Sequence, residues 1–276
     1  MLPILMLVLK ISIALLILAI GLRASWADVT SLWRRPGELF RGVLAMYVLV
    51  PLAALALVRL LQPGPEVTTA LLVLAISAGA PMLPKKLLKL DRESYVLGFA
   101  VTCALLAIVT VPVWLEILGR LFGRDVSIRP GAVALVIAKG FLAPLVVGML
   151  LRLGLKGRAQ AISDGILKVA GAALGIAALV LIGMSFGTIL AVGWGALLTL
   201  ALLAVIAIAI GHLLGGPDEG ERTALAVSCS SRHVGIAMLA ASTTTGKATL
   251  PLVLAYVLAS VVLSIPYLKW RERQAR

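Results

Sequence analysis

The side chains with the most chemical potential stand together late in the chain, in the run Ser228-Cys229-Ser230-Ser231-Arg232-His233. An Arg in the middle of an apolar segment costs roughly 2.5–3.5 kcal/mol on insertion scales, so it is usually paired, faces a cavity and is functional. Arg232 can attract an anionic substrate, or it can bond backbone carbonyls that a break in the helix leaves free. The three serines can line a substrate site or cap helix ends. His233 can carry a proton or be a hydrogen-bonded structural residue.

This group of side chains does not predict an enzyme. An intramembrane enzyme needs a buried acid pair, a His-rich metal site or a Ser beside a base, and only Ser230 or Ser231 with His233 comes near. Neighbouring residues on a helix point apart, and the sequence has no phosphate loop, metal-ligand spacing or nucleophile motif. We therefore predict a protein that is not an enzyme and holds no metal or cofactor.

The composition is that of a membrane protein. Of 276 residues, 61% are apolar and 13% are charged, whereas a soluble domain carries about a quarter charged residues. Apolar runs of roughly 20 residues, the length that crosses a ~30 Å hydrocarbon layer, recur along the chain, so we expect one membrane domain over residues 1–276. The net charge of +13 comes from bases in short loops, which indicates membrane topology and argues against a nucleic-acid partner.

The apolar segments predict an all-α fold of about nine transmembrane helices. Seven are continuous, at Leu2–Leu22, Phe40–Leu61, Ser94–Leu118, Gly131–Leu153, Ser163–Leu190, Gly195–Leu214 and Leu250–Trp270. Two more begin near Glu66 and at Arg222 and are interrupted. The tripeptide Ser25-Trp26-Ala27 resembles a signal-peptide cleavage site, but no base precedes the first apolar run, so we favour a retained first helix.

Basic residues set the predicted orientation. They gather after the first, third, fifth and ninth segments, at Arg23, Arg34, Arg35, Lys85, Lys86, Lys89, Arg92, Arg152, Lys156, Arg158, Lys269, Arg271, Arg273 and Arg276. Cytoplasmic loops are enriched in Lys and Arg. We therefore expect a multi-pass protein of the inner or plasma membrane, with its N-terminus outside and its C-terminus in the cytoplasm.

The two interruptions are the most informative features of the pattern. The first lies at Ala78–Pro84 and the second at Ser228–His233. Irregular backbone at membrane depth must line a cavity or be buried in protein, and many transporters use one broken helix in each half of an inverted repeat. We expect a first repeat over residues 1–119, with its first helix missing, and a second over residues 131–270. The substrate or ion site is expected between the breaks, at Ser77, Gly79, Ala80, Pro81, Ser228, Ser230, Ser231, Arg232 and His233.

Two further residues admit two interpretations each, and a set of glycines admits one. Lys139 either faces a water-filled crevice, which makes it a site residue, or extends its amine to the nearer interface. Thr102 either faces the first break as a site residue or bonds its own backbone. The small residues Gly171, Gly175, Gly183 and Gly187 are spaced for close helix packing and are read as structural.

The motifs resemble those of the bile acid:sodium symporter superfamily. The similar stretches are Gly21-Leu22-Arg23 with Arg34-Arg35-Pro36, Val50-Pro51-Leu52, the break that contains Gly79, and Arg222-Thr223 leading into Ser231-Arg232-His233-Val234-Gly235-Ile236-Ala237. The resemblance implies a core domain with two crossing broken helices, a separate panel domain, and transport of organic anions, usually with sodium. Some members lack the first of ten helices, as this chain is expected to.

The chain departs from the family pattern at the ion sites. The family's Glu and Gln in the second break correspond to Ser228 and Arg232, and Pro81 and Met82 stand near the family's Ser-Asn pair in the first. A guanidinium repels sodium, so these departures argue against sodium coupling. We expect a secondary transporter that carries a small, anionic solute across the lipid bilayer by alternating access. The alternatives are an efflux carrier of related fold, arsenite-like or other, and a receptor or assembly protein that does not transport.

Overall fold

The computed structural model describes residues 2–77, 79, 93–123, 129–155, 157–191, 193–233, 236–237 and 249–274. Every regular element in these ranges is helical. Six of the described helices are long and apolar enough to cross a membrane: Pro36–Leu61, Tyr95–Phe122, Pro130–Gly154, Ala159–Leu181, Trp194–Leu214 and Pro251–Gln274. Two shorter apolar helices, Leu7–Gly21 and Pro65–Ile76, accompany them.

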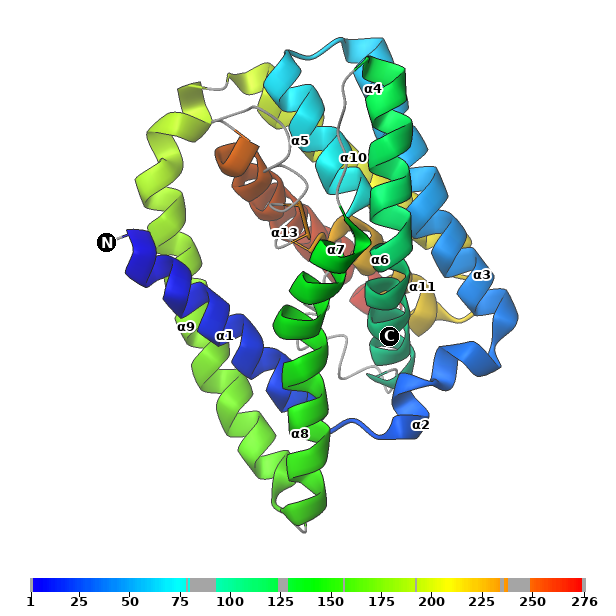
Figure 1. Cartoon of the computed structure of the whole chain (residues 1–276), viewed down its shortest axis with the longest axis vertical. Coiled ribbons are helices and arrows are strands. Elements are labelled where there is room, and N and C mark those ends of the chain that lie inside the picture. The colour runs from blue at the N-terminus through cyan, green and yellow to red at the C-terminus, as the bar shows by residue number, and fades with distance from the viewer. Residues whose placement is uncertain are drawn as a thin grey trace.

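One group of helices, which we call the outer group, forms the left and lower part of Figure 1. It consists of α1 (Leu2–Gly21), α7 (Pro130–Ile137) with α8 (Ala143–Gly154), and α9 (Ala159–Ala191). Helix α1 packs against both α8 and α9. A methyl group on Gly148 would lie 2.2 Å from the Leu18 carbonyl oxygen, and one on Gly21 would lie 2.3 Å from that of Leu145. The two glycines therefore allow α1 and α8 to cross with their backbones in contact.

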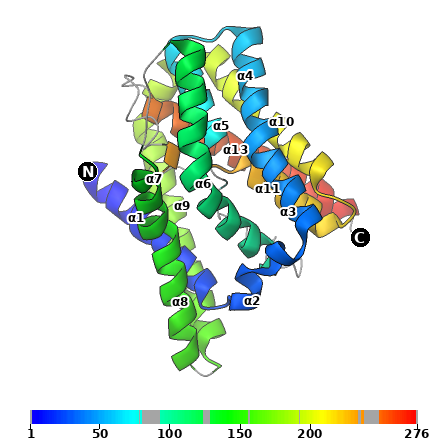
Figure 2. The same ribbon diagram turned by 45° about the vertical axis from the view of Figure 1, so that its right-hand side comes forward.

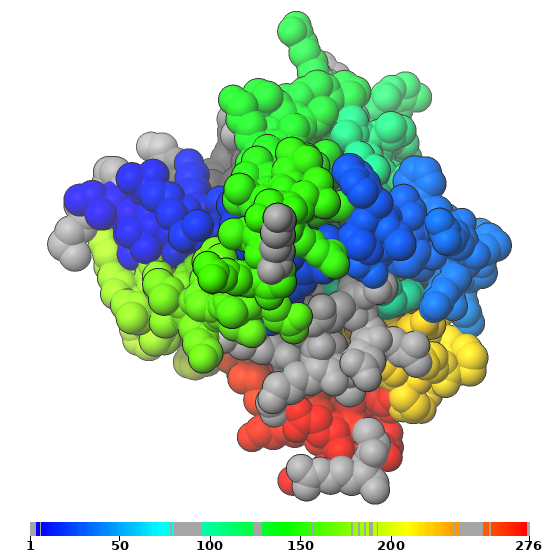
Figure 3. Space-filling view, turned by 90° about the horizontal axis from the view of Figure 1, so that it is seen from below, coloured from blue at the N-terminus to red at the C-terminus, as the bar shows by residue number. Residues whose placement is uncertain are grey.

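The remaining helices form the inner group. A bent rod runs through α3 (Pro36–Leu44), the π-helical segment η2 (Ala45–Leu49) and α4 (Val50–Leu61). The other members are α5 (Pro65–Ile76), α6 (Glu93–Phe122), α10 (Trp194–Leu214), α11 (Glu219–Ser230) and α13 (Thr249–Gln274). Helix α10 contacts α4, α11 and α13, and α5 contacts α4, α6 and α13. Figures 1 and 2 show these helices together, and from below α1 and α9 lie on one side and α3 and α11 on the other (Figure 3).

Two short helices that the hydrophobic pattern does not predict connect the groups. These are α2 (Trp26–Val29) and the 3₁₀ helix η1 (Ser31–Arg34), and both pack on α6. A capping box begins α2, because Ser25 and Asp28 each bond the other's backbone amide. The link between α1 and α3 is thus an ordered structure held against the inner group.

All nine predicted segments overlap a described helix, but several ends differ. The second begins at Pro36 rather than Phe40, the fourth extends to Phe122, and the ninth extends to Gln274. Proline suits the first turn of a helix, and polar end turns escape a hydropathy reading. The total of nine spans and the two-repeat layout stay predictions.

The described structure gives the four glycines of α9 no close helix neighbour. No described atom lies within 4 Å of a methyl group placed on Gly171, Gly175, Gly183 or Gly187. The close approach of helices in the outer group is made by Gly21 and Gly148 instead.

Candidate functional site

Two half-length helices, α5 and α11, enter the inner group from opposite ends. Glu221 in the first turn of α11 accepts a 2.8 Å hydrogen bond from Arg35, which directly precedes the rod. Helix α5 begins beyond the other end of the same rod, after Leu61. Each half-helix has 12 residues and rises about 18 Å, a little over half of a ~30 Å hydrocarbon layer. Each is therefore long enough to reach about the middle of a membrane from one of its surfaces.

Both half-helices end on a serine with extended backbone. Ser77 follows α5 with φ −68° and ψ 146°, and Ser231 follows α11 with φ −79° and ψ 132°. A ψ near −42° would have continued each helix. The extended serines stop the helices and leave their last carbonyl groups without helical donors.

The two ends meet at Gly79. A methyl group on this residue would lie 2.9 Å from the Ser228 carbonyl oxygen and 2.7 Å from Cε of Met46. Gly79 follows α5, Ser228 belongs to the last turn of α11, and Met46 comes from η2. Three elements therefore converge at a point that only glycine fits without displacement. We call this region the crossing.

Arg232 lies inside the crossing and is 2% exposed. Its Nη1 donates a hydrogen bond to the carbonyl oxygen of Ser77 (2.9 Å) and contacts Sδ of Met46 (3.0 Å). Its Nε and Nη2 are buried and have no hydrogen-bond partner among the residues that the structure describes. Within the described part of the chain, one edge of the guanidinium is thus bound to protein and the other edge is not.

The electrostatic surroundings favour a positive charge at Arg232. Helices carry partial negative charge at their carboxyl ends, and the ends of α5 and α11 both face this point. Among the contacts of Arg232 that the structure describes there is no carboxylate. The carboxyl ends of α5 and α11 therefore stabilise the positive charge of Arg232, as a carboxylate does in an ordinary buried ion pair.

The polar neighbours of Arg232 are largely occupied by the backbone. The Ser77 hydroxyl donates to Leu74 (2.8 Å), and the Ser230 hydroxyl donates to Val227 (2.9 Å). The backbone N–H of Ser231 donates to the Val227 carbonyl oxygen (2.9 Å). The sequence left both capping and substrate contact open for Ser230, and its hydroxyl bonds the backbone of its own helix end. The hydroxyl of Ser77, which was expected only as a site residue, makes the equivalent bond at the end of α5.

His233 begins the second half of the interrupted segment. Its carbonyl oxygen accepts from the amides of Ile236 and Ala237, both at 3.0 Å, and its Nδ1 lies 3.4 Å from the Ile236 amide. These contacts are those of an N-terminal cap. The contacts favour the structural interpretation of His233.

The residues that the sequence reasoning missed are Met46 and Tyr256. Tyr256, fully buried on α13, donates to the Ser230 carbonyl oxygen (2.8 Å). Met46 is fully buried in η2. A Met or a Tyr in an apolar segment does not mark a functional site in a single sequence, because both are ordinary components of a buried core. Only their place in the fold brings them to the crossing.

The π-helical segment η2 has a cause that is visible in the sequence. Pro51 has no N–H, so the carbonyl of Tyr47, four residues earlier, loses its helical donor. Trp114 on α6 supplies the missing bond to this oxygen from Nε1 (2.8 Å). Val50 donates five residues back, to Ala45. Single-turn π segments occur frequently at functional sites, and this one holds Met46 against the guanidinium.

The other predicted site residues lie elsewhere or outside the described ranges. Thr102 is buried, donates to Gly98 (2.7 Å) and accepts from Trp33 Nε1 (2.9 Å), so its described contacts join α6 to the connecting segment. Lys139 is exposed in the π-helical segment η4 (Ala138–Leu142) of the outer group. Ala80 and Pro81 lie outside the described residues.

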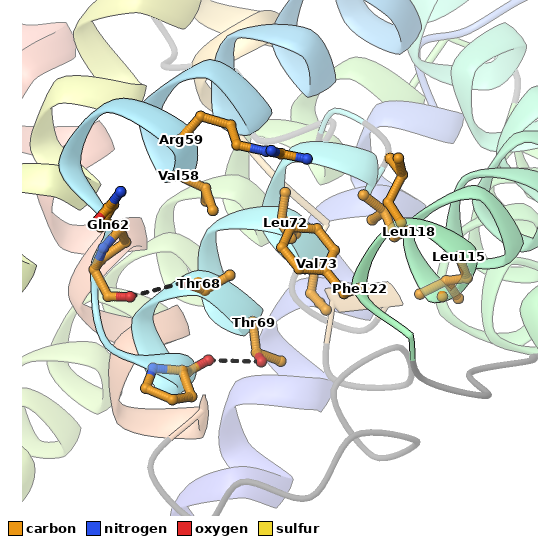
Figure 4. Close-up of a pocket in the computed structure, with 14 residues that line it drawn as sticks. Val58, Arg59, Gln62, Thr68, Thr69, Leu72, Val73, Leu115, Leu118 and Phe122 are labelled. Carbon is orange, nitrogen blue, oxygen red and sulfur yellow. Dashed lines mark hydrogen bonds between the residues drawn. The ribbon is translucent and has the colours of Figure 1, made fainter.

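A cavity of about 650 Å³ opens at the end of the inner group where α4, α5 and α6 meet. Its lining is mostly apolar, with Leu72, Leu118 and Phe122, and Arg59 supplies a cation (Figure 4). The cavity follows α5 as far as Val73, whose carbonyl oxygen accepts from the amide of Ser77. It therefore reaches to within one helical turn of the crossing.

The comparisons with known proteins agree with this architecture. Residues 10–214 match the sodium bile acid symporter family. A search of curated proteins found no match to this chain. The chain is an all-α, multi-pass integral membrane protein. It belongs to the sodium bile acid symporter family.

Membership defines the class of activity in coarse terms. The family indicates a sodium-coupled or related transporter of organic anions or similar solutes, which moves a small molecule across a lipid bilayer. It is a family of transporters and not of enzymes. The match ends at Leu214, the last residue of α10. Half-helix α11 and Arg232 therefore lie beyond the matched range.

Proposed function

We propose that this protein is a secondary transporter that moves a small organic anion by alternating access and does not require sodium. The observation that carries the proposal is the buried guanidinium of Arg232 at the crossing. In a sodium symporter a bound cation would neutralise converging carbonyl oxygens at such a place. Here a covalently attached cation occupies it, and a sodium ion beside it would be repelled.

The two groups of helices supply candidates for the moving parts. The inner group holds the crossing, and the outer group packs its own helices through Gly21 and Gly148. We infer that the outer group and the inner group are the panel and core domains, and that they move against each other around the crossing. The apolar cavity with Arg59 is the candidate route to the crossing for an anion with an apolar body.

Uptake by the purified protein in proteoliposomes tests the proposal. We would load vesicles with unlabelled anion and measure exchange for labelled acetate, pyruvate, benzoate or taurocholate, in sodium-containing and in sodium-free buffer. We expect exchange of at least one probe at the same rate in both buffers. A rate that rises steeply with sodium would overturn the sodium-independent mechanism, and binding without exchange would favour a receptor.

A matched pair of variants connects transport to the crossing. Arg232→Gln should abolish exchange, since it removes the positive charge that attracts the anion. Arg120→Gln, which changes an exposed arginine at the end of α6, should leave exchange unchanged. Tryptophan fluorescence and gel filtration of each variant would establish that both are folded.

A further inference from the structure

The unpartnered edge of Arg232 has a definite chemical shape. A guanidinium is planar, and its Nε–H and one terminal N–H₂ group point in parallel along one edge. In Arg232 the described protein contacts use Nη1, whereas Nε and Nη2 are buried and have no partner in the described ranges. Leaving buried, charged donors unsatisfied is costly, and in native proteins such groups usually have a partner.

We propose that the Nε–Nη2 edge of Arg232 binds one carboxylate group of the transported substrate. This inference rests on the proposed function and specifies its substrate class. Two parallel N–H donors match the two oxygens of a carboxylate in a bidentate arrangement, which is shorter and stronger than a neutral hydrogen bond. A carboxylate placed there satisfies both orphan donors and balances the single buried charge.

The charge at the crossing selects a monoanion over a phosphate-type dianion. Arg232 is the cation that the structure describes there, and the carbonyl oxygens of Ser77, Ser228 and Ser230 lie around it or in the adjoining turn. These oxygens and the carboxyl ends of two helices oppose further negative charge. A dianion would bring one charge more than the guanidinium balances.

The two edges of Arg232 therefore have separate roles. Nη1 holds the end of α5 through Ser77, and the opposite edge receives the ligand. Lysine at this position keeps the positive charge and can reach a carbonyl oxygen, but it has no paired planar donors. Arg232→Lys should preserve the fold and lose the bidentate recognition.

Calorimetric titration of the purified full-length protein in sodium-free buffer tests the assignment. Acetate is the carboxylate probe, acetamide is its neutral isostere, and methanesulfonate is a tetrahedral anion of equal charge. We expect acetate to bind, acetamide not to bind, and methanesulfonate to bind more weakly. Arg232→Lys should weaken acetate binding by about tenfold or more, since a charge-assisted pair is lost. Equal binding of acetate and acetamide by the native protein would refute the proposal, as would equal acetate affinity in folded Arg232→Lys.

Two further variants keep the test decisive if Arg232→Lys does not fold. Arg120→Gln and Lys139→Gln each remove an exposed cation, the first at the end of α6 and the second in the outer group. Acetate binding should persist in both, and its loss in either would place the carboxylate there and overturn the assignment to Arg232. Proteoliposome exchange separates this inference from the transport function. Acetate binding through Arg232 without exchange contradicts transport alone, and exchange of carboxylates that Arg232→Lys does not slow contradicts the Arg232 site alone.

Discussion

A buried arginine at the junction of two helix ends is stabilised by backbone groups, and glycine makes that junction possible. Arg232 bonds Ser77 through one nitrogen, while Gly79 brings the first interruption against Ser228 of the second. The guanidinium needs carbonyl oxygens close by, and a side chain at residue 79 would hold them apart. The contacts of Arg232 thus depend on Gly79, which has no side chain.

Gly79→Ala tests this dependence at the residue scale. The added methyl group would lie 2.9 Å from the Ser228 oxygen, so backbone must move, and overpacking of this kind costs about 1–3 kcal/mol. Gly64→Ala is the control, because no atom lies within 4 Å of its added methyl group. We expect a lower melting temperature for Gly79→Ala only, measured by thermal denaturation in detergent. An unchanged melting temperature would mean that the two interruptions are not in contact.

The prominence of Arg232 was predictable from the sequence, and its geometry was not. A charge inside an apolar run stands out in any hydropathy reading. Which nitrogen is bound, and that Met46 contacts it, depends on η2 and α5, which are 186 and 155 residues away along the chain. Nothing local in the sequence encodes contacts across such separations.

At the scale of elements, the rod is joined to α6 by a hydrogen bond in which a tryptophan replaces the backbone donor that a proline lacks. Pro51 removes the helical donor of the Tyr47 oxygen, and Trp114 replaces it. We expect Trp114→Phe to destabilise the protein by about 1–3 kcal/mol, the cost of a buried acceptor without a donor. Pro51→Ala restores an N–H near the same oxygen. The double variant should therefore lose less stability than Trp114→Phe alone, a coupling that a double-mutant cycle measures.

Additive effects of Pro51→Ala and Trp114→Phe would contradict this account of η2. Guanidinium chloride unfolding of the two single variants and the double variant supplies the free energies for the comparison. Trp194→Phe is a suitable control for the loss of an indole, since Trp194 is 73% exposed at the start of α10.

The long helices were predictable because each contains an apolar run of about 20 residues, which a hydropathy reading detects without ambiguity. The ends of α3 and α6 were misplaced by about a turn, since polar end turns contribute no hydropathy. Helices α2 and η1 escaped prediction because four-residue elements have no periodicity to read. The spacing of the α9 glycines indicates that two helices can approach there, but it does not say which helices do, and the close approach that the structure describes is at Gly21 and Gly148.

At the scale of the whole molecule, the predicted orientation can be tested with single cysteines. Cys103 and Cys229 are both fully buried, so the native protein should react little with an impermeant maleimide. Gly64→Cys lies between α4 and α5, and Gly154→Cys ends α8. With the N-terminus outside, Gly64→Cys should react on intact cells and Gly154→Cys only after permeabilisation. The reverse order would invert the topology, and equal reaction of both on intact cells would contradict a fixed orientation.

The attachment of Arg232 to the chain determines what a transport cycle does to the membrane voltage. A sodium ion would accompany the substrate and leave with it, whereas a guanidinium stays in the protein. Each turnover of the proposed sodium-independent carrier then transfers the negative charge of the solute alone and generates current. A potential of 100 mV, inside negative, contributes about 2.3 kcal/mol per elementary charge, which favours exit from the cell. In the proposed mechanism the membrane potential therefore drives the anion outward.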